Sequence, residues 1–381
     1  MIYLDHNATS PPRPGVAEAM LAAMTATYGN PSSVHGPGRR ARQILDDARR
    51  AVARLVGVHE SRVIFTSGGT ESNHLALLGL AEAADHRGTI LTSAIEHPSV
   101  LNPLERLQAR GMRVIKLPVD AMGRVDAQDV ERALTPDTRL VSIMAANNET
   151  GVLQPIAAIG ALCRTAKVPF HCDATQWFGK LPLGVDAIGA ELITLSAHKS
   201  GGPKGCGALI AGAALPLAPL LLGGGQERGR RSGTENLPGI AGFGLLAGQL
   251  AGQIEDESQR IMALQKKMER ELLKSVPDAI ILGSDAERLP NTTAMLIPGV
   301  DGETLVMTLD LAGFAISSGA ACSSGKNNPS HVPLAMGWTP EATRSMVRVS
   351  LGWETTGTMV DSFISAFQRS VDRLRKGSAF A

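Results

Sequence analysis

The sequence predicts an α/β fold in which a large, mainly parallel sheet is followed by a smaller α+β domain. First, short apolar runs alternate with segments of helical periodicity as far as about residue 210, a pattern typical of a parallel sheet covered on both faces. Second, this alternation stops after about residue 250, where a long amphipathic segment begins. Third, chemically distinctive residues follow several predicted strands, at the end where open α/β sheets bind ligands.

The predicted elements of the first part follow from residue spacing. An apolar stripe predicts a helix over residues 39–56, which Gly57 can end. The stripe consists of Ile44, Leu45, Ala48, Val52 and Leu55. Short apolar runs predict strands at residues 63–66, 89–93, 114–117, 140–144, 168–172, 192–195 and 208–210. Amphipathic helices are predicted between several of them, over residues 98–110, 126–134 and 155–166.

The C-terminal part has a different pattern. An apolar stripe predicts a long helix over residues 253–276, and its members are Ile261, Leu264, Met268 and Leu272. It is followed by predicted strands at 279–282, 293–297 and 346–351 and by a predicted helix at 304–312. We therefore predict a large domain over residues 16–252 and a small domain that combines residues 1–15 with 253–381.

Composition and charge narrow the classes of partner. Lys plus Arg number 37 and Asp plus Glu 36, so no net field draws the chain to nucleic acid or to a membrane. Aromatic residues make up 3%, too few for platforms on which single-stranded bases stack. The first residues have no signal-peptide pattern, and the apolar stretch 208–222 is short and contains two prolines. Four cysteines without CxxC spacing suit a reducing compartment, so we expect a cytoplasmic protein without a metal site.

A glycine-containing turn, Ser67-Gly68-Gly69-Thr70, follows the predicted strand 63–66. Glycines let the backbone approach an anion closely, and the N–H groups at a helix start favour phosphate. Thr70 adds a hydroxyl donor. Many strand-to-helix turns of this kind bind nothing, so the turn alone leaves the phosphate hypothesis open. The G-x-x-x-x-G-K-[ST] spacing of a nucleotide-binding loop is absent.

Two further strand ends carry residues that suit an aldehyde cofactor. Lys199 ends the run Leu195-Ser196-Ala197-His198-Lys199 beside glycines, and a lysine amine in a suitable environment can bind an aldehyde. Lys204, in the following Pro-Gly turn, is the rival amine, and a solvated loop residue is the alternative interpretation. Asp173 closes the strand 168–172, where its carboxylate can pair with a pyridinium nitrogen or cap a helix.

A histidine and a cysteine complete the candidates. His97 precedes a predicted helix, and because a lone histidine is commonly structural it matters only together with the other strand-end residues. Cys322 lies among small polar residues, the setting of a reactive thiol, although composition alone leaves its reactivity an even choice. The other cysteines are expected to pack in helices or strands, and they are Cys163, Cys172 and Cys206.

Together these motifs resemble those of the cysteine desulfurases of the NifS/IscS type, in the class-V aminotransferase family. The resemblance runs from Tyr3-Leu4-Asp5 to Arg348-Val349-Ser350-Leu351. Besides the turn at Gly69, it rests on Asn147-Asn148-Glu149-Thr150-Gly151, Asp173-Ala174-Thr175-Gln176, Ser196-Ala197-His198-Lys199, Gly202-Pro203-Lys204-Gly205, Arg231-Ser232-Gly233-Thr234 and Ser317-Ser318-Gly319-Ala320-Ala321-Cys322. It implies the aspartate-aminotransferase fold (fold type I), a homodimer and bound pyridoxal 5'-phosphate.

The resemblance implies that the cofactor lies at the strand ends. Lys199 is expected to hold it as a Schiff base, Asp173 to pair with the pyridinium nitrogen, and Gln176 to hydrogen-bond the phenolic oxygen. The residues expected around the ring and phosphate are His97, which stacks and takes part in proton transfer, Asn148, and the phosphate-binding Gly69, Thr70, Ser196 and His198, completed by Thr234 of a second subunit.

On the substrate side, the resemblance implies that Arg348 binds the carboxylate of L-cysteine, with Asn148 nearby. Cys322, in the small domain, is expected to take the sulfur as a persulfide and leave L-alanine. Residues 323–333 resemble the long-loop group, which passes sulfur directly to iron–sulfur scaffolds or other acceptor proteins. The recipient stays open between nitrogenase clusters, general iron–sulfur assembly, thiamine and tRNA, as does a transient iron–sulfur contact through Cys322.

Two alternative functions remain. An aminotransferase or a selenocysteine-specific lyase has the same fold, and an aminotransferase shares Lys199 and Asp173 but does not need Cys322. A nucleic-acid-binding protein is expected to use the basic turn Arg228-Gly229-Arg230-Arg231. The balanced charge and the lack of neighbouring aromatic residues argue against that function.

Overall fold

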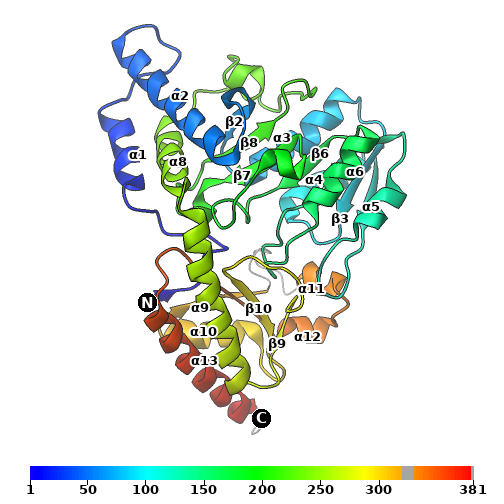
Figure 1. Cartoon of the computed structure of the whole chain (residues 1–381), viewed down its shortest axis with the longest axis vertical. Coiled ribbons are helices and arrows are strands. Elements are labelled where there is room, and N and C mark those ends of the chain that lie inside the picture. Colours follow the sequence, from blue (N-terminus) through cyan, green and yellow to red (C-terminus); the bar gives the residue numbers. More distant parts are fainter. Residues whose placement is uncertain (320–328, 379–381) are drawn as a thin grey trace.

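The computed structural model describes residues 1–319 and 329–378. Figure 1 shows a large sheet with its helices in one part of the molecule and a second, smaller sheet with its own helices in the other. The predicted α/β fold with a large, mainly parallel sheet is confirmed. The domain boundaries at residues 16–252 and at 1–15 with 253–381 stay a prediction.

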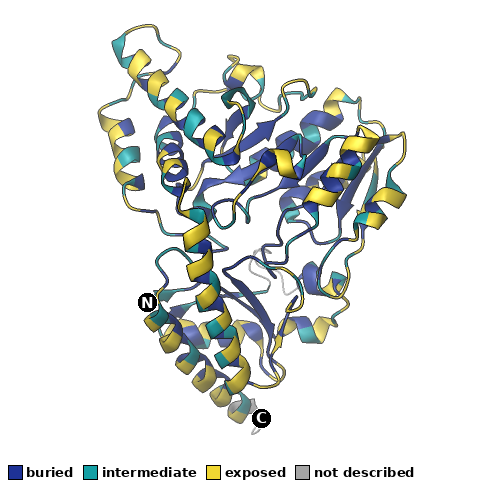
Figure 2. Cartoon of the chain, viewed as in Figure 1, coloured by how far each residue is buried: buried dark blue, intermediate teal, exposed yellow. Residues whose placement is uncertain are grey.

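The large sheet has seven strands in the order β2-β8-β7-β6-β5-β3-β4. The strands are β2 (Val63–Thr66), β3 (Thr89–Ser93), β4 (Arg113–Leu117), β5 (Thr138–Ser142), β6 (Phe170–Asp173), β7 (Leu192–Ser196) and β8 (Gly207–Ala211). Only β8 runs antiparallel to its neighbours, β2 and β7. The inner strands are buried on both faces, as Figure 2 shows, which explains their continuous apolar runs. Six strands therefore end at one edge.

Some of the helices that surround this sheet were predicted and others were not. They are α1 (Val16–Thr25), α2 (Gly36–Val56), α3 (Gly69–Ala83), α4 (Pro98–Gln108), α5 (Ala127–Ala133), α6 (Ile156–Ala166), α7 (Val185–Ile188) and α8 (Leu237–Leu250). Gly57 ends α2 with φ 75°, as predicted, because a glycine adopts this left-handed conformation without steric cost. The sequence analysis did not predict α1 and α8. Helix α8 is apolar nearly all round, since it lies buried against α1 and α2, and it therefore shows no amphipathic stripe.

A missing side chain allows α8 to approach α2 closely. A Cβ on Gly244 of α8 would lie 2.6 Å from the Cα and the Cβ of Ala48. Because no real Cβ is found at that distance, a larger residue at position 244 has to push the two helices apart. Gly244 therefore contributes to packing, although glycine has a low helix propensity.

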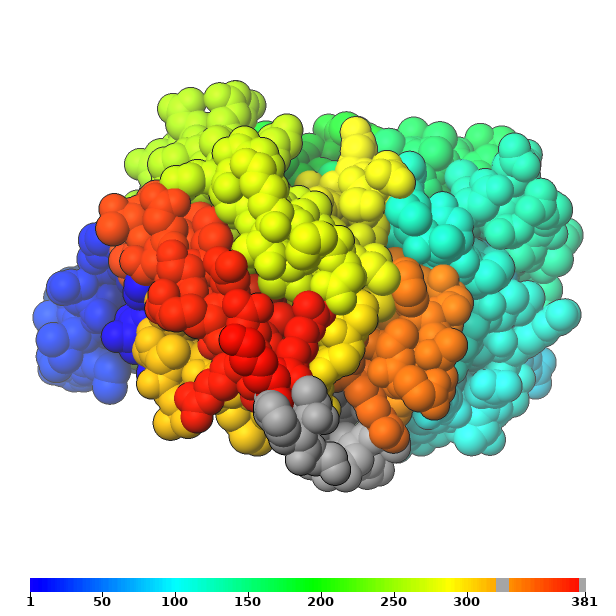
Figure 3. Space-filling model, turned by 90° about the horizontal axis from the view of Figure 1, so that it is seen from below, coloured from blue at the N-terminus to red at the C-terminus, as the bar shows by residue number. Residues whose placement is uncertain are grey.

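The second sheet is antiparallel, in the order β12-β13-β10-β9. Its strands are β9 (Ile280–Ile281), β10 (Thr292–Leu296), β12 (Ser317–Ser318) and β13 (Met346–Ser350). The helices of this part are α9 (Ile254–Ser275), α10 (Gly302–Leu311), α11 (His331–Ala335), α12 (Pro340–Arg344) and α13 (Gly357–Ser378). The helix α13, which the sequence analysis did not predict, lies beside α9 on the face seen in Figure 3. A separate apolar core fills the space between the sheet and the helices α9, α10 and α13.

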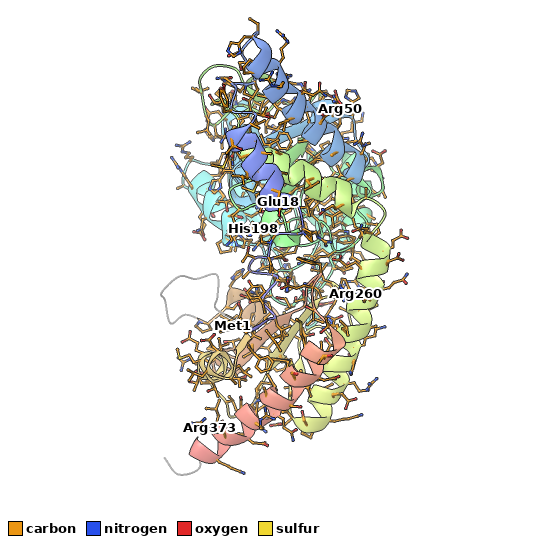
Figure 4. The ribbon with its side chains drawn as sticks, turned by 90° about the vertical axis from the view of Figure 1, so that its left-hand side faces the viewer. Met1, Glu18, Arg50, His198, Arg260 and Arg373 are labelled. Carbon is orange, nitrogen blue, oxygen red and sulfur yellow. The ribbon has the colours of Figure 1, made fainter. Side chains whose placement is uncertain are left out.

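The N-terminal segment joins the two parts. Strand β1 (Ile2–Tyr3) pairs in parallel with β11 (Phe314–Ala315), and Asp5 bridges to Ser350 of β13. The next residues cross to the large sheet, where the Ser10 N–H donates to the His198 carbonyl at 2.8 Å. Figure 4 shows His198 between the large-sheet part and the part that carries Met1.

Within the described residues, no single helix is long and apolar enough to cross a membrane. Helices α8 and α9 reach the required length and hydropathy only as a pair, and they are bent by 79° at their junction.

Candidate active site

A cavity with an empty volume of about 630 Å³ lies at the carboxyl ends of the parallel strands. Most residues predicted for the cofactor site line it, namely Gly69, Thr70, His97, Asn148, Asp173, Gln176, Ser196, His198 and Lys199. The sequence analysis missed other lining residues, which are Asn7, Asn73, Ser99, Met144, Ala146 and Thr175. Asn73 and Thr175 are neighbours of predicted motifs and could have been found from them, whereas Asn7 carries no local signal of this kind.

Asp173, the last residue of β6, is held in one orientation. Its Oδ2 accepts from Asn73 Nδ2 at 2.7 Å, and its Oδ1 accepts from the Thr175 N–H at 2.9 Å. Asp173 as a whole residue is 7% exposed. The residues after it form a turn and not a helix, so a simple helix cap does not explain its position. A carboxylate fixed in this way can pair with a cationic ring nitrogen in the cavity.

His97 caps the N-terminus of α4. Its Nδ1 accepts from the Ser99 N–H at 3.1 Å, so the proton of the neutral ring lies on Nε2. Burial lowers the pKa of His97, and the Asp173 carboxylate opposes this shift. A neutral histidine with its proton on Nε2 can donate to, or exchange a proton with, a group in the cavity.

Lys199 lies in the short 3₁₀ helix η2 (Ala197–Ser200), directly after β7. Its Nζ donates to the carbonyl oxygens of Asn7 and Ala8, both at 2.8 Å. The amine is therefore held at the cavity wall by the N-terminal segment. The rival amine, Lys204, is on an exposed turn.

The turn before α3 forms the part of the cavity expected to bind phosphate. Gly68 has φ 153° and makes no side-chain cap, and the helix begins at Gly69. Burial, followed by repulsion from Lys199 and Lys204, lowers the pKa of His198 to about 4, so its ring is neutral near pH 7. Neutral N–H and hydroxyl donors with a helix N-terminus suit an anion. Thr234 is exposed and does not line this cavity, so its expected role depends on a second subunit.

The close approach at Gly69 leads to a first prediction. A Cβ there would lie 2.9 Å from Thr175 Oγ1, inside the cavity. Overfilling a packed site costs about 1–3 kcal/mol. We therefore expect Gly69→Ala to raise the dissociation constant of pyridoxal phosphate by about tenfold, measured by titrating the apoprotein. Gly248→Ala is the matched control, because its Cβ meets nothing within 4 Å. Equal affinity in both variants would contradict a tight cofactor contact at Gly69.

Arg348, expected to bind the substrate carboxylate, is buried in β13. Its Nη2 pairs with Asp5 Oδ1 at 2.8 Å, and its Nη1 donates to the Asn148 carbonyl at 3.0 Å. It does not itself line the cavity and reaches it through Asn148. Binding of the substrate carboxylate by Arg348 stays a prediction. It requires this carboxylate to displace Asp5 from Arg348 or to bind Arg348 beside Asp5.

The cysteines differ in their surroundings. Cys163, Cys172 and Cys206 are buried and unpaired, as predicted for packing residues. Burial raises the pKa of Cys163 and Cys206 to about 12, and it raises that of Cys172 still more clearly. None of them can supply a thiolate readily. Cys322 lies in residues 320–328, outside the described part of the chain.

The basic turn is occupied by contacts within the chain. Arg231 pairs with Glu71 at 2.9 Å, Arg228 donates to the Ser61 carbonyl, and Arg230 donates to the Ala213 carbonyl. These contacts favour a structural role for the turn over the nucleic-acid alternative.

The comparisons with known proteins agree with the geometry of the cavity. The model of the aminotransferase class-V family matches residues 2–363. A cysteine desulfurase of Cereibacter sphaeroides is 42% identical over all of this chain and 98% of its own length. A solved NifS-like protein superimposes with a TM-score of 0.91 and 34% identity, covering 98% of this chain and 99% of that chain. SspA, solved in complex with cysteine, has a TM-score of 0.83 and 34% identity over 93% and 100% of the two chains. This chain therefore belongs to the class-V aminotransferases, and within them to the cysteine desulfurases.

Proposed function

We propose that this chain is a pyridoxal-phosphate-dependent cysteine desulfurase, which converts L-cysteine to L-alanine and delivers the sulfur to an acceptor. One observation carries this proposal: a single cavity brings together His97, Lys199 and the pair Asp173 and Gln176 from three separate segments. A whole-length relative that is a cysteine desulfurase and a structural neighbour that binds cysteine support the same reaction.

The cavity fits pyridoxal phosphate. Two buried side-chain atoms there have no hydrogen-bond partner among residues 1–319 and 329–378, namely Thr175 Oγ1 and Asn73 Oδ1. A Cβ at position 69 would crowd Thr175 Oγ1, so a glycine at this position leaves more room for an anion. Lys199 would hold the aldehyde, Asp173 the ring nitrogen and Gln176 the phenolic oxygen. The phosphate would meet Gly69, Thr70, Ser196 and His198, with Thr234 of a second subunit. When bound, the group supplies an electron sink for bonds at the substrate's α-carbon.

The residues of the chain supply the remaining steps. Asp173, fixed by Asn73, presents the carboxyl group with which the ring nitrogen would pair. The Lys199 amine would take and return protons when it is not bonded to the cofactor, and His97 would offer a second site for proton exchange through Nε2. Met144 and Ala146 add apolar surface to the wall of the cavity. Asn148 lines the cavity and would lie beside the cofactor, and we propose that it and Arg348 orient the substrate carboxylate.

Sulfur transfer requires a thiolate, and we assign this role to Cys322. The C–S bond of L-cysteine breaks, hydrogen replaces sulfur on the β-carbon, and an S–S bond forms on Cys322, which leaves L-alanine and a persulfide. The described residues on both sides of segment 320–328 support the assignment. Ser317 of β12 lies opposite Arg348 in the neighbouring strand β13. On the other side of the segment, Ser330 Oγ donates to Glu149 Oε2 at 2.6 Å, and Glu149 is next to Asn148 in the chain.

Three further proposals concern the oligomeric state of the enzyme, its sulfur acceptor and its cellular location. We propose a homodimer, supported by the exposed position of Thr234, and sulfur delivery to an iron–sulfur scaffold or another acceptor protein. A cytoplasmic location is supported by three buried thiols that remain unpaired.

The test of this function is a product analysis. We expect the protein reconstituted with pyridoxal phosphate to release equal amounts of alanine and of reducible sulfur from L-cysteine. An aminotransferase instead yields a keto acid and needs an amino acceptor. Protein without cofactor and L-serine in place of L-cysteine are the controls. Failure to form alanine, or formation of a keto acid instead, would overturn the desulfurase assignment.

A further inference from the structure

A second lysine, Lys180, lies next to the cavity in the turn region after β6. Its Nζ donates to Gln176 Oε1 at 2.6 Å and to Asn7 Oδ1 at 2.8 Å. With Lys199 it also lines a narrow adjoining cavity. Burial lowers the pKa of Lys180 well below its ordinary value, and repulsion from Lys199 and Arg348 lowers it further. An amine buried at such a cost needs its hydrogen bonds, so these two contacts define its position.

The contacts of Lys180 determine how the Gln176 amide faces. The carbonyl oxygen Oε1 accepts from Lys180, while Nε2 donates to the Asn7 carbonyl at 3.0 Å. The amide therefore cannot turn over without losing both bonds. Nε2 carries a second hydrogen, and because Gln176 lines the cavity, a cofactor oxygen can accept this hydrogen.

Asn7 connects Lys180 to the reactive amine. The Asn7 carbonyl that accepts from Gln176 also accepts from Lys199 Nζ at 2.8 Å. The Asn7 side chain accepts from Lys180 at Oδ1 and donates from Nδ2 to the Asn148 carbonyl at 3.1 Å. Asn7 is 1% exposed. Lys180 thus contacts Gln176 directly, and the buried Asn7 links it to Lys199 and to Asn148.

We propose that Lys180 is a positioning residue for the cofactor: it orients the Gln176 amide and holds Asn7, which receives the Lys199 amine. The proposal rests on the proposed function, since it concerns the same cofactor. It separates Lys180 from Lys199, which bonds to the cofactor, because Lys180 acts only through its neighbours. It also gives the N-terminal segment a part in building the site.

A double-mutant cycle on cofactor binding tests this proposal. Lys180→Met is expected to raise the dissociation constant of pyridoxal phosphate on the order of tenfold, as is Gln176→Ala. If Lys180 acts through Gln176, the double variant is expected to bind within about twofold of Gln176→Ala alone, and not about a hundredfold more weakly than the wild type. The visible absorption band of the bound cofactor is expected to shift in the same direction in both single variants, because each weakens the bond to the phenolic oxygen.

Gln265→Met is the matched control. This buried side chain also makes two hydrogen bonds, to the Leu289 and Thr292 carbonyls, but neither it nor its partners line the cavity. The visible absorption band of the cofactor and its dissociation constant are expected to be the same in Gln265→Met as in the wild type. Should Lys180→Met not fold, Lys180→Gln ends one atom short of the amine and enters the same cycle. Additive losses, or an unshifted band, overturn the proposal, while alanine formation by the wild type tests the desulfurase function separately.

Discussion

Replacing Cys322 by alanine is expected to abolish sulfur release from L-cysteine and to leave the yellow cofactor in place. The loss should be on the order of 10³-fold or more, the scale on which an enzyme loses its nucleophile. The reason is the state of the other thiols, since burial raises the pKa of Cys163 and Cys206 to about 12 and of Cys172 well above its ordinary value. No described cysteine can therefore replace the missing thiolate near neutral pH.

The measurement combines three readouts on one preparation. Visible absorbance reports cofactor binding, sulfide after reduction reports turnover, and peptide mass reports one added sulfur atom on Cys322 of the wild type. Cys163→Ala is the matched control, because this cysteine packs in α6, does not line the cavity and is expected to leave turnover unchanged. Wild-type turnover by Cys322→Ala would show that a different group accepts the sulfur.

Replacing Lys199 by alanine is expected to remove the covalent bond to the cofactor and to lower turnover by about 10²–10⁴-fold, the contribution of a positioned acid–base group. Asp173, Gln176 and the turn at Gly69 remain, so pyridoxal phosphate should still bind, but reversibly. Borohydride treatment of the wild type should attach the cofactor to Lys199, and the variant should release it on denaturation.

Two other lysines make this experiment decisive. Lys180 is half-buried beside the site, and Lys204 is on an exposed turn after Lys199. Lys204→Ala is the matched control and is expected to keep both the covalent label and the turnover. Labelling of Lys180 or Lys204 in the wild type, or full activity of Lys199→Ala, contradicts the assignment of the reactive amine.

Several elements agree with sequence expectations because their signals are local. The strands β2 and β3 begin and end where their apolar runs do. The strand predicted at 140–144 is instead β5 at Thr138–Ser142. Residues that follow it are still extended, since the Ile143 and Ala145 N–H groups donate to the carbonyls of His171 and Asp173. The boundary thus depends on pairing with β6, which the run of apolar residues does not encode.

One helix that was not predicted, α8, differs from the predicted helices in what surrounds it. Helix α8 is buried against α1 and α2, so it has no polar face to mark its period. Its contact with α2 depends on Gly244 lying against Ala48, and these residues are far apart in the chain. Glycine destabilises an isolated helix, yet it is favoured at position 244 because α8 and α2 approach closely there.

The sequence by itself determined the fold class, the family and the strand ends at which Gly69, His97, Asp173 and Lys199 occur, because a parallel β/α arrangement brings those ends to one edge. Only the tertiary structure decided how the site is held together. Asn73 fixes Asp173, and Asn7 joins Lys199 to Gln176 and Lys180. These hydrogen bonds link residues up to 192 positions apart. Such contacts form only when the folded chain brings their donors and acceptors within about 3 Å, a condition that no local spacing expresses.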